Sequence, residues 1–169
     1  PYPTDAPIDP INAYGRSKAL GEKLVAEAGG PHLIIRTSWL YAPWANNFVL
    51  TMANLTADKD ALTVVDDQRG RPTSAEHLAR VSQQLYASGQ RGIFHVTDGG
   101  ECTWHGLASF VSQHLGHTCD VAPCTSDAFP RPAPRPAYSV LDLSKTEAAV
   151  GEMTDWKTNV AAALDASRS

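Results

Sequence analysis

The sequence predicts an α/β fold that contains a parallel sheet. Three observations support this prediction. Short apolar, β-branched runs alternate along the chain with longer amphipathic segments, a capping residue precedes several of those segments, and glycine follows several of them. At 169 residues the chain has room for one domain with its own core, or for part of a larger domain.

The alternation can be followed along the chain. Helical periodicity predicts helices over residues 13–28, 48–56, 75–88, 104–115, 144–150 and 155–166. Apolar or β-branched runs predict strands over residues 32–41, which should be buried, and over residues 62–65, 92–97 and 121–123. Ser74 and Thr103 are expected helix N-caps, whereas Gly29 and Gly116 follow expected helix ends. The prolines of residues 126–136 predict an extended loop.

Composition narrows the class of protein. The chain is 43% hydrophobic and 19% charged, which is ordinary for a globular protein. Its formal net charge of −4 gives no reason to expect nucleic acid or an anionic membrane as a partner. No apolar run approaches the ~20 residues that span a bilayer. The three dispersed cysteines do not suggest a disulfide framework, so a cytoplasmic location is expected.

Tyr14 and Lys18 stand four residues apart in the first expected helix. This spacing puts both side chains on one helix face, where the lysine ammonium can stabilise the phenolate form of the tyrosine. A phenol beside a cation is suited to proton transfer. The Tyr-x-x-x-Lys spacing alone is a weak signal, because a chain of this size contains it by chance fairly often.

The surrounding residues carry a resemblance to a known family. The stretch Asn12-Ala13-Tyr14-Gly15-Arg16-Ser17-Lys18-Ala19-Leu20-Gly21-Glu22 resembles the active-site helix of extended short-chain dehydrogenases/reductases that act on nucleotide sugars. Further segments are similar, in the same order, to the dTDP-4-dehydrorhamnose reductase family: residues 36–41, 46–49, 64–73, 92–97 and 135–142. Ala42 and Pro43 depart from that family, which often has glycine there. The resemblance implies the C-terminal part of a Rossmann-like, doubly wound parallel sheet with a small substrate-binding α/β subdomain.

The resemblance also implies a division of the chain. Residues 1–45 and about 74–97 would supply sheet and helix elements of the nucleotide-binding fold, and about 46–73 and 98–169 the substrate-binding part. A Gly-rich turn between a strand and a helix, which cradles the phosphates of a dinucleotide, does not occur in this sequence. We therefore expect the N-terminal cofactor half of the domain to be absent here. We also expect the 169 residues alone to be inactive and to bind NADPH weakly.

By resemblance, the intact enzyme would be an NAD(P)H-dependent oxidoreductase. It would reduce the C4 keto group of a dTDP-4-keto-6-deoxyhexose, converting dTDP-4-dehydrorhamnose to dTDP-rhamnose. The alternatives are another nucleotide-sugar epimerase or dehydratase of the same superfamily, and a non-catalytic regulatory subunit related to it. NADPH or NADH would be the cofactor. A requirement for Mg²⁺, a homodimeric state and the identity of the 4-keto sugar stay open.

The resemblance assigns roles to particular residues. Tyr14 would donate a proton to the C4 oxygen, Lys18 would hold the nicotinamide ribose, and both would therefore contact the cofactor. Trp39 would pack on the sugar ring. The remaining substrate-binding candidates come from two loops: Asn46, Asn47, Gln68, Arg69, Arg71 and Thr73. Asparagines also suit a helix N-cap and loop arginines also suit solvent, so these alternatives stay open.

Other polar and aromatic side chains are expected to be structural. Arg36 in a strand is expected to form an ion pair, and Arg135 is a weaker candidate for substrate binding. His95 and Trp104 are expected to pack in the core. A metal site is not expected from a late cluster of histidines and cysteines whose spacing fits no regular zinc knuckle: His114, His117, Cys119 and Cys124.

Overall fold

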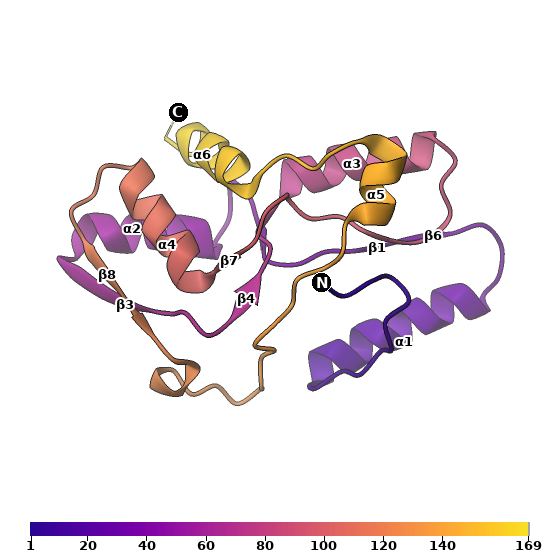
Figure 1. Cartoon of the computed structure of the whole chain (residues 1–169), viewed down its shortest axis with the longest axis horizontal. Helices are drawn as coiled ribbons and strands as arrows, with labels where there is room; N and C mark the ends of the chain where they lie inside the picture. Colours follow the sequence, from indigo (N-terminus) through magenta and orange to yellow (C-terminus); the bar gives the residue numbers. More distant parts are fainter. Residues whose placement is uncertain (169) are drawn as a thin grey trace.

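The structure is a computed structural model that describes residues 1–168, in which helices alternate with short strands (Figure 1). The helices of this part are α1 (Ala13–Glu27), α2 (Phe48–Asp58), α3 (Ala75–Ala87), α4 (Trp104–His114), α5 (Ser144–Val150), α6 (Trp156–Ala166) and the short 3₁₀ helix η1 (Ser126–Ala128). The strands are β1 (Leu33–Arg36), β2 (Leu40–Tyr41), β3 (Ala61–Val65), β4 (Arg69–Gly70), β5 (Thr73–Ser74), β6 (Gly92–His95), β7 (Cys102–Thr103) and β8 (Asp120–Cys124). The predicted α/β class is confirmed.

The strands of the described chain form pairs, most of which are parallel. β1 pairs with β6, β2 with β5 and β3 with β8 in parallel, whereas β4 and β7 are antiparallel. In the first pair Arg36 lies opposite His95. A parallel pair requires a crossover, so each brings together segments that are far apart in the sequence.

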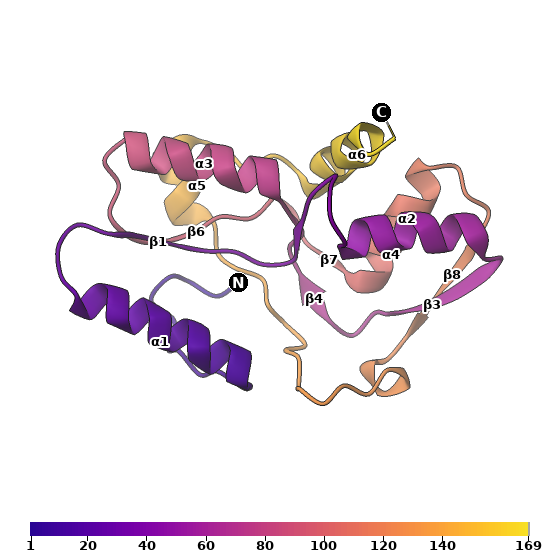
Figure 2. The ribbon, with the colours of Figure 1, turned by 180° about the vertical axis from the view of Figure 1, so that it is seen from behind.

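Helices lie on both sides of the β1–β6 pair (Figures 1 and 2). α3 and α5 lie on one side and α1 on the other. The α3 side contains a buried apolar core: Val81, Leu85, Phe94, Val96, Leu143 and Met153. α1, by contrast, has no buried residue. Consequently β1 is only half-buried, and the expectation of a buried strand there is wrong.

A second core fills the other part of the molecule, where α2, α4 and α6 meet beside β3 (Figure 1). Its buried members are Tyr41, Val49, Met52, Val64, Cys102, Leu107, Ala108, Val111, Trp156, Val160, Ala163 and Leu164. α5 comes from the range assigned above to the substrate-binding part, yet it packs against α3 and β6. The two cores are therefore built from interleaved stretches of the chain.

Side-chain caps begin helices where the sequence predicts them. Ser74 Oγ accepts a hydrogen bond from the His77 N–H at the start of α3, and Thr103 Oγ1 accepts one from Gly106 at the start of α4. Gly116 follows α4 with a φ of 71°, a left-handed conformation that glycine adopts without steric cost. Within residues 1–168 no helix is both long and apolar enough to cross a bilayer.

The single strand expected over residues 32–41 is in fact interrupted. Trp39 has a φ of 46°, and this left-handed conformation separates β1 from β2. Thr73 Oγ1 donates a hydrogen bond to the Ser38 carbonyl oxygen at 2.6 Å, and Ser38 Oγ donates to the Arg71 carbonyl oxygen at 2.8 Å. These partners lie far along the chain, so the local apolar pattern could not reveal the interruption.

A buried carboxylate ties the two parts of the molecule together. Asp98 is fully buried and accepts hydrogen bonds from Tyr41 Oη at 3.0 Å and from the Ser74 N–H at 3.1 Å. Asn159 Nδ2 donates to the same carboxylate at 2.8 Å, and His77 Nδ1 lies 2.7 Å from it. Burial and the neighbouring Asp98 charge raise the pKa of Tyr41 far above its usual value. The carboxylate therefore joins β2, α3 and α6.

Candidate functional site

The predicted tyrosine–lysine pair lies on the exposed surface of α1. The Tyr14 side chain is 71% exposed, and Lys18 Nζ lies 5.8 Å from the centre of the Tyr14 ring. α1 begins here because Asn12 Oδ1 accepts a hydrogen bond from the Gly15 N–H at 2.8 Å. Lys18 Nζ has no hydrogen bond or ion pair to another residue of the described chain, so its three N–H donors are available to a ligand.

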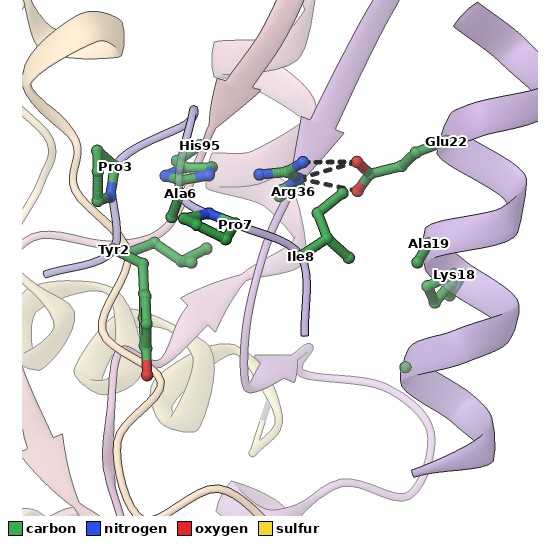
Figure 3. Close-up of a pocket in the computed structure, with 12 residues that line it drawn as sticks. Tyr2, Pro3, Ala6, Pro7, Ile8, Lys18, Ala19, Glu22, Arg36 and His95 are labelled. Carbon is green, nitrogen blue, oxygen red and sulfur yellow. Dashed lines mark hydrogen bonds and ion pairs between the residues drawn. The ribbon is translucent and has the colours of Figure 1, made fainter. Parts of the chain in front are cut away.

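A pocket of about 220 Å³ lies between α1, β1 and the first residues of the chain (Figure 3). It is lined by Tyr2, Pro3, Ala6, Pro7, Ile8, Gly15, Lys18, Ala19, Glu22, Arg36, His95 and Leu141. Arg36 crosses from β1 to Glu22 on α1, donating from Nη2 at 2.7 Å and from Nε at 2.9 and 3.1 Å. Arg36 Nη1 also donates to the Thr4 carbonyl oxygen. The prediction of a structural ion pair at Arg36 is confirmed, and this pair holds α1 against β1.

His95 lines the same pocket with one nitrogen unused. The side chain is 1% exposed, and its Nδ1 donates to the Asp142 carbonyl oxygen at 3.0 Å. Its Nε2 has no hydrogen-bond partner within residues 1–168. Burial lowers the pKa of His95, which favours the neutral ring. The predicted core position of His95 is confirmed.

A larger pocket, of about 780 Å³, lies beside α2, β3 and the proline-rich loop. It is lined by Phe48, Met52, Leu55, Lys59, Ala61, Leu62, Thr63, Val64, Val65, Gln68, Trp104, Ser126, Phe129, Arg131 and Arg135. Aromatic rings can stack on a nucleobase, and guanidinium groups bind phosphate oxygens in a forked geometry. The lining is therefore suited to a nucleoside diphosphate.

Trp39 and Trp104 form a stacked pair beside the larger pocket. Their ring centres are 3.6 Å apart with an interplanar angle of 12°, and Phe48 lies against Trp104 at 4.6 Å. Trp104 Nε1 donates to Gln68 Oε1 at 3.1 Å. Gly70 leaves room for the Trp39 ring, because a Cβ at that position would lie 2.5 Å from it. The predicted packing role of Trp104 is confirmed, and one face of Trp39 is covered by its partner ring.

Several predicted loop residues hold the loops themselves in place. Asn47 Oδ1 accepts a hydrogen bond from the Leu50 N–H at 3.1 Å and so caps α2, which confirms the N-cap alternative, while Asn46 is exposed beside it. Thr73 is fully buried. Gln68, another predicted substrate-binding residue, lines the larger pocket.

The two predicted phosphate-binding arginines lie elsewhere. Arg69 Nη1 forms an ion pair with Glu101 at 2.7 Å, and Arg71 lines a separate polar pocket. The arginines at the larger pocket are Arg131, which the sequence reasoning missed, and Arg135, which it ranked as a weaker candidate. The sequence did contain a signal for these two arginines. Residues 129–136 alternate proline with phenylalanine, arginine and alanine, and two arginines in one such loop suggest that the loop binds an anionic ligand.

The late cluster of histidines and cysteines is dispersed. His117 Nδ1 lies 2.8 Å from Thr56 Oγ1, and His114 Nε2 lies 3.1 Å from Asp165. Within residues 1–168 no three or more His, Cys, Asp or Glu side chains are grouped so that they could hold a metal ion.

Comparisons with protein families, curated proteins and solved structures all point to the same family. A family model described as the RmlD substrate binding domain matches residues 1–169. The dTDP-4-dehydrorhamnose reductase of Streptomyces griseus is 43% identical over 156 residues, which cover 88% of this chain and 51% of that protein. The crystal structure of a dTDP-4-dehydrorhamnose reductase from Clostridium acetobutylicum has a TM-score of 0.94 at 37% identity and covers 100% of this chain and 60% of that one.

A further solved structure contains a cofactor. The dTDP-4-dehydrorhamnose reductase of Bacillus anthracis in complex with NADP has a TM-score of 0.89 at 32% identity, covering 94% of this chain and 57% of that one. The chain thus spans between half and two thirds of the length of these relatives.

Proposed function

Because the chain belongs to the family of RmlD substrate binding domains, we propose that it is the substrate-binding part of a nucleotide-sugar reductase. The intact enzyme reduces the C4 keto group of a dTDP-4-keto-6-deoxyhexose and converts dTDP-4-dehydrorhamnose to dTDP-rhamnose. The relatives named dTDP-4-dehydrorhamnose reductase support this reaction. The observation that carries the proposal is the exposed Tyr14 on α1 with the Lys18 ammonium beside its ring.

Tyr14 is the proton donor in this proposal. As a hydride is added to C4, the electrons of the C4–O π bond move to the oxygen, and the Tyr14 hydroxyl transfers its proton there to give the alcohol. The phenolate left behind is stabilised by the positive charge of Lys18. Because the pair lies one helical turn apart on a capped helix, both groups stay on the same side of α1.

The cofactor would be NADPH or NADH. A reduced nicotinamide supplies the hydride when it is bound, and the NADP complex of the Bacillus anthracis relative supports this class of cofactor. The available donors of Lys18 Nζ fit ribose hydroxyl groups, which accept hydrogen bonds. A role for Mg²⁺ forms no part of this proposal.

The nucleotide part of the substrate would occupy the larger pocket. Arg131 and Arg135 would bind the diphosphate, and Phe129 would contact the base. These arginines are better placed than Arg69, whose guanidinium is already paired with Glu101. Asn46 and Trp39 stay candidates for binding the sugar.

The proposed location is the cytoplasm, because Cys102, Cys119 and Cys124 form no disulfide bond.

Replacement of the tyrosine tests the mechanism. Tyr14→Phe in the intact enzyme removes the proton donor and keeps the ring, so kcat should fall by about 10²-fold or more. The assay follows nicotinamide absorbance with a dTDP-4-keto-6-deoxyhexose and NADPH. Tyr86→Phe is a matched control, because Tyr86 is also 71% exposed on a helix, but within residues 1–168 no lysine ammonium lies over its ring as Lys18 does over Tyr14.

The possible outcomes separate the alternatives. If wild type is active and Tyr14→Phe keeps most of that rate, the proposed mechanism is wrong. Conversion of the sugar with no net oxidation of NADPH would instead identify an epimerase or a dehydratase. No turnover together with stable capture of a partner enzyme would favour a regulatory subunit.

A further inference from the structure

The side-chain amide of Asn12 makes two hydrogen bonds that join distant parts of the chain. Its Oδ1 accepts from the Gly15 N–H at 2.8 Å and caps α1. Its Nδ2 donates to the Pro134 carbonyl oxygen at 3.0 Å, across 122 positions in the sequence. One planar group thus holds the start of the helix that carries Tyr14 and, at the same time, the loop that carries Arg131 and Arg135.

The loop has few other attachments. Its start is fixed where Ser126 donates to both carboxylate oxygens of Asp67, at 2.6 and 2.9 Å. Its end is fixed where the Arg69 N–H donates to the Ala137 carbonyl oxygen at 2.8 Å. Between these points, within the described chain, the Asn12 bond is the hydrogen bond that holds residues 130–136 to the rest of the molecule.

The sequence of this segment explains why it has few attachments. Four of its seven residues are prolines, which have no N–H to donate and which keep the preceding residue extended. The whole of residues 129–138 is exposed. The carbonyl oxygens remain available as acceptors, and Figure 1 shows the loop passing the start of α1, where Asn12 reaches one of them.

We propose that Asn12 is a positioning residue that couples nucleotide binding by the loop to the placement of Tyr14, an inference that rests on the proposed function. When a diphosphate orders Arg131 and Arg135, the Pro134 carbonyl is held in place, and the Asn12 amide with it. Tyr14 lies two positions after that amide in the first turn of α1, so the nucleotide helps to hold the proton donor against the sugar. Binding energy from a non-reacting part of the substrate is thereby used at the reacting carbon.

The test separates the two hydrogen bonds of Asn12. Asn12→Asp keeps an oxygen for the helix cap, and Asp is as good an N-cap as Asn, but it removes the donor to Pro134. In the intact enzyme, kcat/KM for the dTDP-4-keto sugar should fall about three- to tenfold, the range expected for one solvent-accessible hydrogen bond. The dissociation constant for dTDP, measured by calorimetry, should rise by a similar factor.

A truncated substrate provides the readout that a purely structural role would not change. With the 4-keto-6-deoxyhexose 1-phosphate, which has no nucleoside, Asn12→Asp and wild type should have equal kcat/KM. Asp155→Asn is the control, since it exchanges the same two residue types at the cap of α6, where Asp155 Oδ1 accepts from the Lys157 N–H. This variant should leave both substrates and dTDP binding unchanged.

Each outcome is decisive for one of the two proposals. An equal loss with both substrates, or no loss with either, overturns the coupling. Wild type that binds dTDP but does not reduce the sugar overturns the proposed function, and the coupling is then judged by the dTDP affinity of Asn12→Asp. Wild type that neither binds dTDP nor reduces the sugar overturns both.

Discussion

Substitution of Gly70 by alanine should displace the Trp39 ring. A Cβ at Gly70 would lie 2.5 and 2.7 Å from two carbons of Trp39 and 2.8 Å from the Ser139 hydroxyl oxygen, all below the 3.0 Å that real Cβ contacts respect. To reach an ordinary contact of 3.4 Å, the ring must retreat by about 0.9 Å. The ring is already stacked on Trp104 with centres 3.6 Å apart, so this movement disturbs the stack.

The size of the effect follows from the cost of overpacking. One methyl group forced into a packed site costs about 1–3 kcal/mol, which corresponds to a fall in melting temperature of roughly 2–12 °C for a chain of this size. Differential scanning calorimetry on the purified protein measures this fall. In the intact enzyme, kcat/KM for the nucleotide sugar should also decrease, because Trp39 is a candidate for the sugar.

Gly21→Ala is the matched control for this substitution. Gly21 lies in α1, and a Cβ there would meet no atom within 4 Å. Alanine is favoured over glycine in a helix by about 0.5–1 kcal/mol, so the control should melt slightly above wild type. Were Gly70→Ala to melt with wild type or with Gly21→Ala, the packing argument for the Trp39 site would be wrong.

Two further predictions concern the smaller pocket. Arg36→Met should lower the free energy of unfolding by about 1–3 kcal/mol, because it leaves a mostly buried Glu22 carboxylate without its partner. Urea titrations measure this loss. If the double variant with Glu22→Gln loses as much free energy of unfolding as the two single variants added together, the pairing is contradicted. His95 has a lowered pKa in the folded state, so the unfolded chain binds the proton more readily and stability should fall as the pH drops below about 6.5, levelling off below the folded pKa. His95→Gln should flatten this part of the stability profile, measured by urea unfolding between pH 7.5 and 5.5, and an unchanged slope would show that another group is responsible.

Local patterns were sufficient for most of the secondary structure. Helix caps such as Ser74 and Thr103, and stop signals such as Gly116, act through hydrogen bonds and backbone conformations within a few residues. The interruption at Trp39 was missed because Ser38 is held by Arg71 and by Thr73 of β5, which lie more than 30 positions further along the chain. The residues next to Ser38 in the sequence therefore do not predict this contact.

The candidate site could be predicted only in part, for the same reason. The spacing of Tyr14 and Lys18 determines that they share a helix face, and the structure keeps them together. The choice among arginines depends on which acidic groups are nearby, and Glu101 pairs with Arg69 because β4, which contains Arg69, lies beside β7, which Glu101 directly precedes. Arg131, in a loop without regular structure, then faces the larger pocket.

By itself, the sequence determined the α/β class, the order of the helices and strands, and the tyrosine–lysine pair, because these depend on periodicity and spacing along one stretch of chain. The tertiary structure alone decided which arginines line the larger pocket, that Asp98 joins the two cores, and that the Asn12 amide connects α1 to the proline-rich loop. Those features arise from contacts between residues far apart in the chain, and such contacts are set by packing, which leaves no periodic signal in the sequence.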